Sequence, residues 1–225
     1  MIKIEKQSVC GFEHAIRGMR NPMNSWDRSD SEWDFVEDPS VINPDDQLML
    51  VLGNNDHDLM MRLAKAGPVH AKYRRMITVY VDITAPLYWW KEFDTYKVGT
   101  VANSCSTMHK IADHEFTMSD FSCEHLESEQ DFCSIGSSDV LALTINHLNM
   151  NREKFLETKD KKYWWQMIQL LPSSYNQTRT VMMNYEVLAG IYRWRKDHKL
   201  DEWVDFCKWI ESLPYSELIT LEEEA

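Results

Sequence analysis

Residues 86–108 read PLYWWKEFDTYKVGTVANSCSTM, and the stretch changes character half-way along. Its first half is bulky and amphipathic, with a Trp pair at Trp89 and Trp90. From Gly99 onward the side chains are small and often hydroxylated. The pattern predicts a helix over residues 87–97 that runs into a small-residue loop. Such a junction suits the binding of a flat ligand.

The composition is that of one globular domain. The chain has 225 residues, 44% hydrophobic and 27% charged, so we expect a single domain over residues 1–225. Residues 21–46 are rich in Asn, Asp, Ser and Pro, which predicts a loop-rich insertion. Its Trp26, Trp33 and Phe35 are expected to pack on the domain. Residues 216–225 form an acidic tail.

The charge balance limits the choice of partner. A formal net charge of −12 disfavours a nucleic-acid polymer, because phosphate neutralisation needs a basic surface. A small anionic ligand held by a few local Arg or Lys residues stays compatible with it. Five irregularly spaced Cys without a CxxC are typical of a reduced intracellular protein. With no signal-peptide core and no apolar run of about 18 residues, we expect a cytoplasmic protein without a membrane span.

The apolar spacing predicts an α+β fold dominated by helices. Few Gly and Pro, seven of each, argue against a turn-rich all-β fold. Period-two alternation predicts strands over residues 2–10 and 72–83. Helical spacing and end signals predict helices over residues 11–20, 43–53, 55–66, 87–97, 138–158, 159–171, 179–198 and 201–212.

Two sets of residues have metal-binding or catalytic side chains without a matching pattern. The first is a cluster of His109, Asp113, His114, Glu115, Cys123, His125 and Cys133. These residue types bind metals, but their spacing matches no closed zinc site, so a solvated polar connection is the preferred interpretation. The second is Cys105, which has no His nearby in the sequence to activate it as a nucleophile. We therefore expect neither a metal site nor an enzyme nucleophile.

The predicted helix over residues 179–198 carries a more specific arrangement. Arg193 and Arg195 are two residues apart and cannot share a helical face, so one of them must turn toward the packed side. An inward-facing Arg needs an anion or a carboxylate. Asn184 lies eleven residues before Arg195, about three helical turns away on the same side. The pair could grip a ligand along the helix.

The stretch from Pro86 resembles the signature of the flavin-dependent thymidylate synthases, the ThyX family. There, P-[IL]-[FY] leads into RHRxxSxNExSxRY. An ungapped alignment from Pro86 keeps this frame with altered residues. The chain has Thr95, Tyr96 and Lys97 for Arg-His-Arg, Thr100 for the first Ser, Ala102-Asn103 for Asn-Glu, Cys105 for the second Ser, and Thr107-Met108 for Arg-Tyr.

Two further blocks are similar to the same family. The family has Leu-Pro followed twelve residues later by the Asn of NxRxLxxFLxLR; this chain has Leu171-Pro172, then Asn184, Leu188 and Arg195 in register. Glu186 stands where the family has Arg. Before the predicted strand, residues 69–71 read Val-His-Ala and resemble the family's Glu-His-Ala, which gives His70 a counterpart.

The resemblance implies a fold, an activity and an assembly. It implies a helix-rich ThyX-like fold with a small antiparallel sheet, assembled as a homotetramer with its sites at subunit junctions. It implies reductive methylation at C5 of dUMP or a related pyrimidine nucleotide. FAD would be the cofactor, with NADPH and methylenetetrahydrofolate as co-substrates. No enzyme nucleophile is required, since reduced flavin supplies the hydride.

The resemblance also implies roles for individual residues. It places His70, Tyr96, Lys97, Asn103 and Asn184 at the flavin. It places Lys91, Glu92, Thr100, Ser104, Cys105 and Arg195 at the nucleotide.

Two alternatives stay open. The chain could be a ThyX-fold nucleotide-binding or regulatory protein that has lost the flavin, because Thr95, Thr107 and Glu186 replace three family arginines. It could also be an unrelated helical protein in which the aromatic segment is only core, since aromatic stripes usually are.

Overall fold

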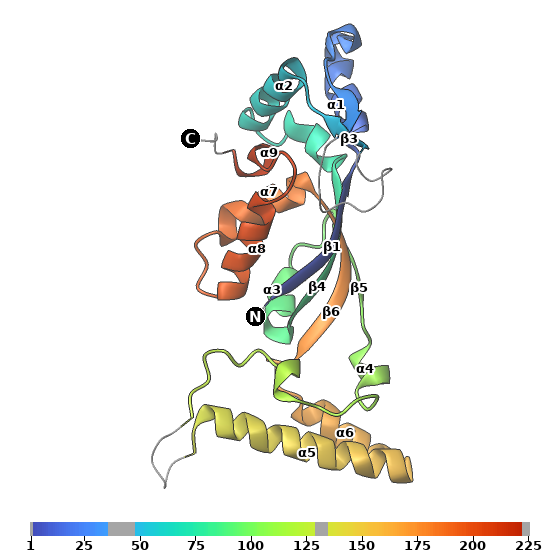
Figure 1. The fold of residues 1–225 in the computed structure, drawn as a ribbon, viewed down its shortest axis with the longest axis vertical. Helices are drawn as coiled ribbons and strands as arrows, with labels where there is room; N and C mark the ends of the chain where they lie inside the picture. The colour runs from blue at the N-terminus through green and yellow to red at the C-terminus, as the bar shows by residue number, and fades with distance from the viewer. Residues whose placement is uncertain (1, 36–47, 129–134, 222–225) are drawn as a thin grey trace. The chain divides into compact units, whose positions relative to one another are not determined.

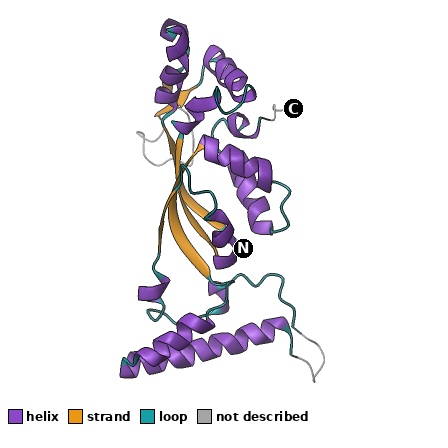
Figure 2. Cartoon of the chain, turned by 180° about the vertical axis from the view of Figure 1, so that it is seen from behind, coloured by secondary structure: helices purple, strands orange, loops and turns teal. Residues whose placement is uncertain are grey.

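The computed structural model describes residues 2–35, 48–128 and 135–221 (Figure 1). Helix is the predominant secondary structure, as expected for a helix-rich α+β protein (Figure 2). The chain divides into two compact units. The first comprises Met1–Glu5, Asp82–Thr95 and Ala102–Val181, and the second comprises Lys6–Val81, Tyr96–Val101 and Met182–Ala225.

Within the described residues, six strands form two sheets. The four-stranded sheet has the order β1 (Lys3–Cys10), β4 (Thr78–Pro86), β6 (Asn176–Asn184), β5 (Val101–Ser104). Thr84 is hydrogen-bonded to Thr178, and Asp82 accepts a hydrogen bond from Thr180. Residue numbers therefore fall along β4 as they rise along β6, so the two strands are antiparallel. The second sheet pairs β2 (Glu32–Phe35) antiparallel with β3 (Leu48–Val51).

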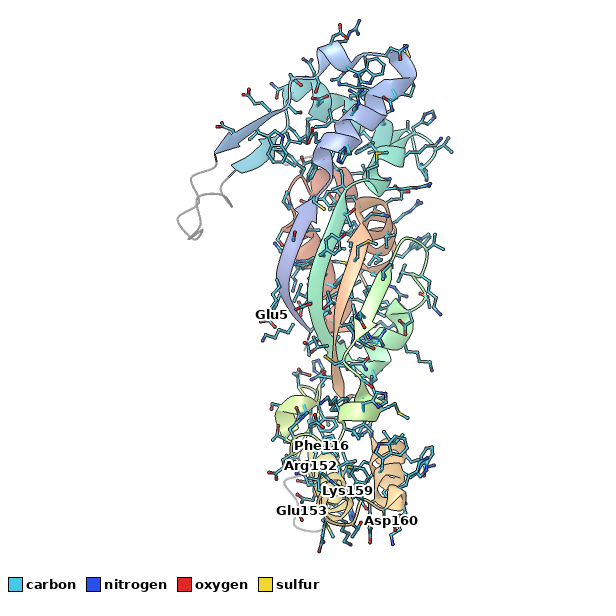
Figure 3. The ribbon with its side chains drawn as sticks, turned by 90° about the vertical axis from the view of Figure 1, so that its right-hand side faces the viewer. Glu5, Phe116, Arg152, Glu153, Lys159 and Asp160 are labelled. Atoms are coloured by element: carbon cyan, nitrogen blue, oxygen red, sulfur yellow. The ribbon has the colours of Figure 1, made fainter. Side chains whose placement is uncertain are left out.

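The first unit contains a helical hairpin with its own core. Helix α5 (Ser137–Thr158) turns into α6 (Lys161–Leu170) at Lys159, whose φ of 56° places it in the left-handed region. Asp160 then caps α6 by accepting from the Lys162 N–H. Figure 3 labels Phe116, Arg152, Lys159 and Asp160 in this part of the chain. The cluster beneath the hairpin consists of Ile111, Ala112, Phe116, Phe121, Leu141, Ile145, Leu148 and Met167.

Residues 86–108, the aromatic and small-residue stretch, lie mainly in this first unit. Helix α3 (Leu87–Phe93) ends four residues earlier than predicted. Trp89, Trp90 and Phe93 are all buried, and the Trp89 and Phe93 rings stack at 5.1 Å. The Trp90 indole N–H donates to the carbonyl of Gln177 on β6. The first half of the stretch is therefore core, as an aromatic stripe usually is. The unit also holds α4 (Thr107–Lys110) and the 3₁₀ turn η5 (Met118–Asp120).

The second unit is built from helices and short 3₁₀ turns. Its N-terminal part contains α1 (Phe12–Arg20), η1 (Asn21–Met23), η2 (Trp26–Arg28), α2 (Asn54–Lys65) and η4 (Ala71–Arg75). Its C-terminal part contains α7 (Tyr185–Arg195), α8 (Asp201–Glu211) and α9 (Glu217–Thr220). Helix α7 packs on η4, α8 and α9. The large aromatic side chains that are fully buried in the second unit are those of Tyr185, Trp203 and Phe206.

A buried ion pair fixes the segment that follows α1. Arg20 and Asp56 are 4% and 0% exposed, and Arg20 Nε lies 2.6 Å from Asp56 Oδ1. The second oxygen of Asp56 accepts from Ser29 and from both the hydroxyl and the N–H of Ser31. Burial alone would raise the pKa of Asp56, but these hydrogen bonds outweigh it and hold the pKa below its usual value.

Several sequence predictions were wrong about the type of element. Residues 176–184 form strand β6, not the first part of a helix over 179–198; β-branched Thr178, Thr180 and Val181 pair there with a distant strand. The four-residue run Leu48–Val51 is a strand, not part of a helix over 43–53, because it pairs with β2. The start of that predicted helix, residues 43–47, lies outside the described residues.

Other predictions were wrong in their details. Residues 71–75 are the 3₁₀ turn η4 and not the start of the strand predicted over 72–83. Helix α2 begins after Gly53 with no side-chain cap of its own; Asp30 accepts from the N–H groups of Asn55 and Asp56 instead. Trp26 and Trp33 are 42% and 55% exposed, so they pack less closely than predicted. Phe35 and the end of the acidic tail lie outside the side chains that the structure describes.

Candidate functional site

Asn184, one of the predicted flavin contacts, is the N-cap residue of helix α7. The Asn184 side-chain oxygen accepts from the Val187 N–H at 3.0 Å, which caps the helix. A Cβ added at Gly99 would lie 3.1 Å from the Asn184 amide nitrogen and 3.0 Å from the Val187 side chain. Gly99 also has a φ of +81°, which favours glycine. Both the close contacts and the backbone conformation therefore require a residue without a side chain. The small-residue segment therefore lies directly against the start of α7.

The other end of α7 contacts Tyr96, three residues before Gly99, through Arg195. Arg195 Nε donates to the Tyr96 hydroxyl at 2.9 Å. The guanidinium carbon lies 4.7 Å from the centre of the buried Trp203 ring and 5.7 Å from that of Tyr96. Arg193, in contrast, is exposed. Arg195 is thus the arginine that turns toward the packed side, with aromatic faces and a hydroxyl around it.

Lys97 lies between these two contacts in the sequence, and Thr100 directly follows Gly99. Lys97 is exposed, and its carbonyl accepts from the Thr100 N–H at 3.4 Å. Within the part of the chain that the structure describes, the buried Thr100 Oγ1 has no hydrogen-bond partner. A buried hydroxyl without a partner costs free energy, so this atom is a ready contact for a ligand's polar group.

Glu186 has taken on a structural role in this fold. It stands in the first turn of α7 and lies 2.8 Å from Nη2 of Arg74, whose side chain is 5% exposed. Nη1 of Arg74 also donates to the Leu218 carbonyl. Arg74 belongs to η4 and not to the strand that was predicted over residues 72–83. The pair leaves the carboxylate of Glu186 neutralised inside the second unit.

His70 opens onto a large pocket within the second unit. The side chain is exposed at the rim of a pocket of about 1210 Å³, walled by α1, η1, η2, α2 and η4. Figure 1 shows α1 and α2 beside each other at this place. The cationic lining residues Arg20, Arg28, Arg62 and Lys72 face a single acid, Asp27. The sequence did not reveal this pocket, because three separate segments supply its cations.

The remaining predicted site residues belong to the first unit. Lys91 is exposed and Glu92 is half-buried on α3. Asn103, Ser104 and Cys105 are exposed at the end of β5, where the Cys105 N–H donates to the Thr178 carbonyl. These side chains are accessible to a ligand. Arg179 lies on β6 and not on a helix, and it pairs with Asp94 at 2.8 Å.

The described residues contain no candidate metal site and no candidate membrane span. No group of three or more His, Cys, Asp or Glu residues could hold a metal ion there. Of the predicted 109–133 cluster, Cys133 lies outside them. No helix among them is long and apolar enough to cross a membrane.

Comparison with solved structures identifies the fold. The chain matches ThyX from Helicobacter pylori, solved with FAD and dUMP, with a TM-score of 0.66 and 15% identity over 98% of each chain. The chain has the ThyX fold. A second ThyX structure from that organism, also with FAD and dUMP, gives 0.64 and 15% identity, covering 97% of this chain and 98% of that one.

The ThyX fold also occurs in a more distant neighbour. The UMP/dUMP methylase PolB from Streptomyces cacaoi, bound with 5-Br UMP, gives a TM-score of 0.58 and 12% identity, covering 94% of this chain and 88% of that one. At the level of sequence, no family model and no curated protein matches the chain. The ThyX resemblance is therefore confirmed for the fold, which excludes an unrelated helical protein.

Proposed function

We propose that this protein is a flavin-dependent nucleotide methylase of the ThyX type. It would methylate C5 of dUMP or a related pyrimidine nucleotide, with FAD as cofactor and with NADPH and methylenetetrahydrofolate as co-substrates. One observation carries the proposal: residues 96–100 contact α7 at both ends, through Asn184 beside Gly99 and Arg195 beside Tyr96. The block that starts at Pro86 and the block that contains Asn184 and Arg195 each resemble a ThyX motif, and the two blocks are in contact.

The residues around His70 fit a flavin in size and charge. A pocket of about 1210 Å³ exceeds the roughly 300–1,000 Å³ of most small-molecule sites, so room is not limiting. The flavin, once reduced, would supply the hydride of the reaction. The protein's own residues would orient the two ring systems and exclude water. We assign His70 to the flavin side because it lines this pocket, and we assign Tyr96, Lys97, Asn103 and Asn184, which are not part of the lining, from the resemblance to ThyX.

The nucleotide side of the proposal rests on the resemblance to ThyX. We assign Lys91, Glu92, Thr100, Ser104, Cys105 and Arg195 to it. Glu92 stands at a position where the ThyX family tends to have Gln. An ionised carboxylate only accepts hydrogen bonds, whereas an amide both donates and accepts them. A changed base edge is therefore part of the proposal, and UMP and dUMP, the substrates in PolB's name, are the first pair to compare.

The family resemblance extends the proposal to assembly. A single-domain chain would form a homotetramer, with sites completed at subunit junctions. Size-exclusion chromatography with light scattering measures this directly: a mass near four times 26.6 kDa supports it, and a monomer contradicts it.

Visible spectroscopy and turnover test the proposed activity. Purified protein should be yellow or should bind added FAD, with absorbance in the flavin region. With NADPH, methylenetetrahydrofolate and dUMP or UMP, it should then form the C5-methylated nucleotide. A colourless protein that binds no added FAD would contradict the proposal.

A second candidate function rests on the Arg74–Glu186 pair. At the position where the family has Arg, this chain has a carboxylate that is already neutralised by Arg74. That change favours a nucleotide-binding or regulatory protein that has lost the flavin, because each charge-assisted anion contact contributes roughly 1.5–3 kcal/mol. Nucleotide binding without flavin binding would support this alternative, and turnover of dUMP with NADPH and the folate would exclude it.

A further inference from the structure

The pocket at His70 has a charge opposite to that of the whole protein. The chain carries a net charge of −12, yet the pocket lining has four cationic side chains and one carboxylate, Asp27. Concave sites lined by one sign of charge concentrate the potential and attract ligands of the other sign. The pocket therefore favours an anionic ligand.

Three of these cations have no ionic partner in the described residues. Arg28, on η2, and Lys72, on η4, are exposed and form no ion pair there. Arg62, on α2, is also exposed, and its Nε donates to the Asp58 carbonyl in the preceding turn. The three come from three different elements around one pocket, so their charges converge on it.

The fourth cation, Arg20, is built into the wall of the pocket. Its side chain is 4% exposed and pairs with Asp56 through Nε. Its Nη1 donates to the Ser25 carbonyl at 3.3 Å. Its Nη2 is buried and has no hydrogen-bond partner among residues 2–35, 48–128 and 135–221. A guanidinium with an unused donor beside a cationic pocket is a second sign that an anion belongs there.

The ThyX signature positions supply less positive charge in this chain than in the family, and Lys97 is the cation that remains of the Arg-His-Arg frame. Three family arginines are replaced by Thr95, Thr107 and Glu186, and Glu186 neutralises Arg74. We infer that the charge that holds the flavin phosphates has moved to the pocket cations Arg28, Arg62 and Lys72. The inference rests on the proposed function and names the ligand class of this pocket: a flavin bearing one or more phosphate groups.

The apolar part of the lining agrees with a flat ring system. Met19, Met23 and Met76 line the same pocket, and Met23 and Met76 are exposed. Methionine side chains adapt to flat, irregular surfaces and make favourable contacts with aromatic rings. The pocket thus offers methionines to a ring and cations to a phosphate, the two chemistries that a phosphorylated flavin combines.

Flavins that differ only in phosphate content test the inference. Riboflavin, FMN and FAD carry no, one and two phosphate groups, and each can be titrated by the quenching of flavin fluorescence. In the wild type, FMN should bind at least about tenfold more tightly than riboflavin, a difference of about 1.4 kcal/mol. This preference should weaken as salt is raised, since exposed charges are screened.

The variants Lys72→Glu and Arg28→Glu locate the charge that is responsible. Each should weaken FMN and FAD binding by about tenfold or more and change riboflavin binding by less than about twofold. Arg75→Glu is the matched control, because Arg75 is exposed on the same turn as Lys72 but lies outside the pocket lining. It should leave all three affinities within about twofold. Far-ultraviolet circular dichroism checks that every variant is folded.

The outcomes separate the inference from the proposed function. Equal effects of Lys72→Glu and Arg75→Glu, or equal losses for riboflavin and FMN, would overturn the inference while leaving flavin binding in place. A wild-type protein that binds none of the three flavins would overturn both.

Discussion

Glu186 in the first turn of α7 pairs with the nearly buried Arg74 of η4, with 2.8 Å between Oε2 and Nη2. Arg74 also donates to the Leu218 carbonyl of α9, so one guanidinium joins three elements of the second unit. A carboxylate is favourable in a first helical turn because the helix dipole is positive there. The residue that departs from the family's arginine is therefore part of what holds α7 in place.

Removing the carboxylate should destabilise the fold. Glu186→Gln leaves Arg74 buried without a countercharge, and we expect a loss of about 3 kcal/mol in the free energy of unfolding, near the low end for a broken buried pair. Glu186→Arg, which restores the family residue, should be worse because it places two cations together. Urea denaturation measures both, and a change below about 0.5 kcal/mol would contradict the structural role.

Replacing Arg195 should separate binding from folding. Arg195→Ala removes the guanidinium that lies on Trp203 and contacts Tyr96. We expect about 1 kcal/mol of lost stability from the cation–π contact and a loss of about tenfold or more in dUMP affinity. Arg193→Ala on the exposed face of α7 is the control and should change neither. Calorimetry with dUMP and urea denaturation give the two quantities; a loss of stability alone would contradict a nucleotide role.

The sequence predicted local elements better than paired ones. Helices α5, α6 and α8 follow apolar spacing and end signals within one stretch, so they were predicted nearly residue for residue. Strand β6 was read as helix because Val181 and Tyr185 also fit a helical spacing. Its partner β4 lies about a hundred residues earlier, and no local signal carries that pairing.

In the candidate site, too, residues on one element were predicted together, whereas contacts between distant segments were not. Asn184 and Arg195 were predicted as a pair along one element, and they are the N-cap and the last residue of α7. Gly99 and Tyr96 contact them only after the chain has folded back. Arg28, Arg62 and Lys72 lie on separate segments without a motif, so periodicity could not have grouped them. The burial of Arg74 was not predicted either, because residues 71–75 form η4 and not the start of the strand predicted over residues 72–83.

Gly99→Ala should disturb the junction between the small-residue segment and α7. The added Cβ would meet Val187 at 3.0 Å and Asn184 at 3.1 Å, on a backbone with a φ of +81°. We expect a loss of about 1–3 kcal/mol from backbone strain alone and a weaker Asn184 cap. Gly67→Ala is the control, because Gly67 also has a positive φ, +97°, but a Cβ added there would meet no atom within 4 Å. A larger loss at Gly67 would contradict close packing at Gly99.

Asp56→Asn should make stability depend less on pH in the acid range. The pKa of Asp56 lies below its ordinary value of 3.8 in the folded protein. Its stabilisation is therefore complete above about 3.8 and is lost as the pH falls through the lower folded-state pKa. At neutral pH the variant leaves Arg20 unpaired, and we expect a loss of about 3–5 kcal/mol.

The difference between wild type and Asp56→Asn is the quantity to follow. Urea denaturation between pH 7 and pH 3 should give a gap that is constant down to about pH 4 and narrows below it. Asp58→Asn, on the exposed face of the same helix, is the matched control. It should cost less than about 0.5 kcal/mol at neutral pH, as most surface substitutions do. A gap for Asp56→Asn that stays constant to pH 3 would show that its ionisation does not stabilise the fold.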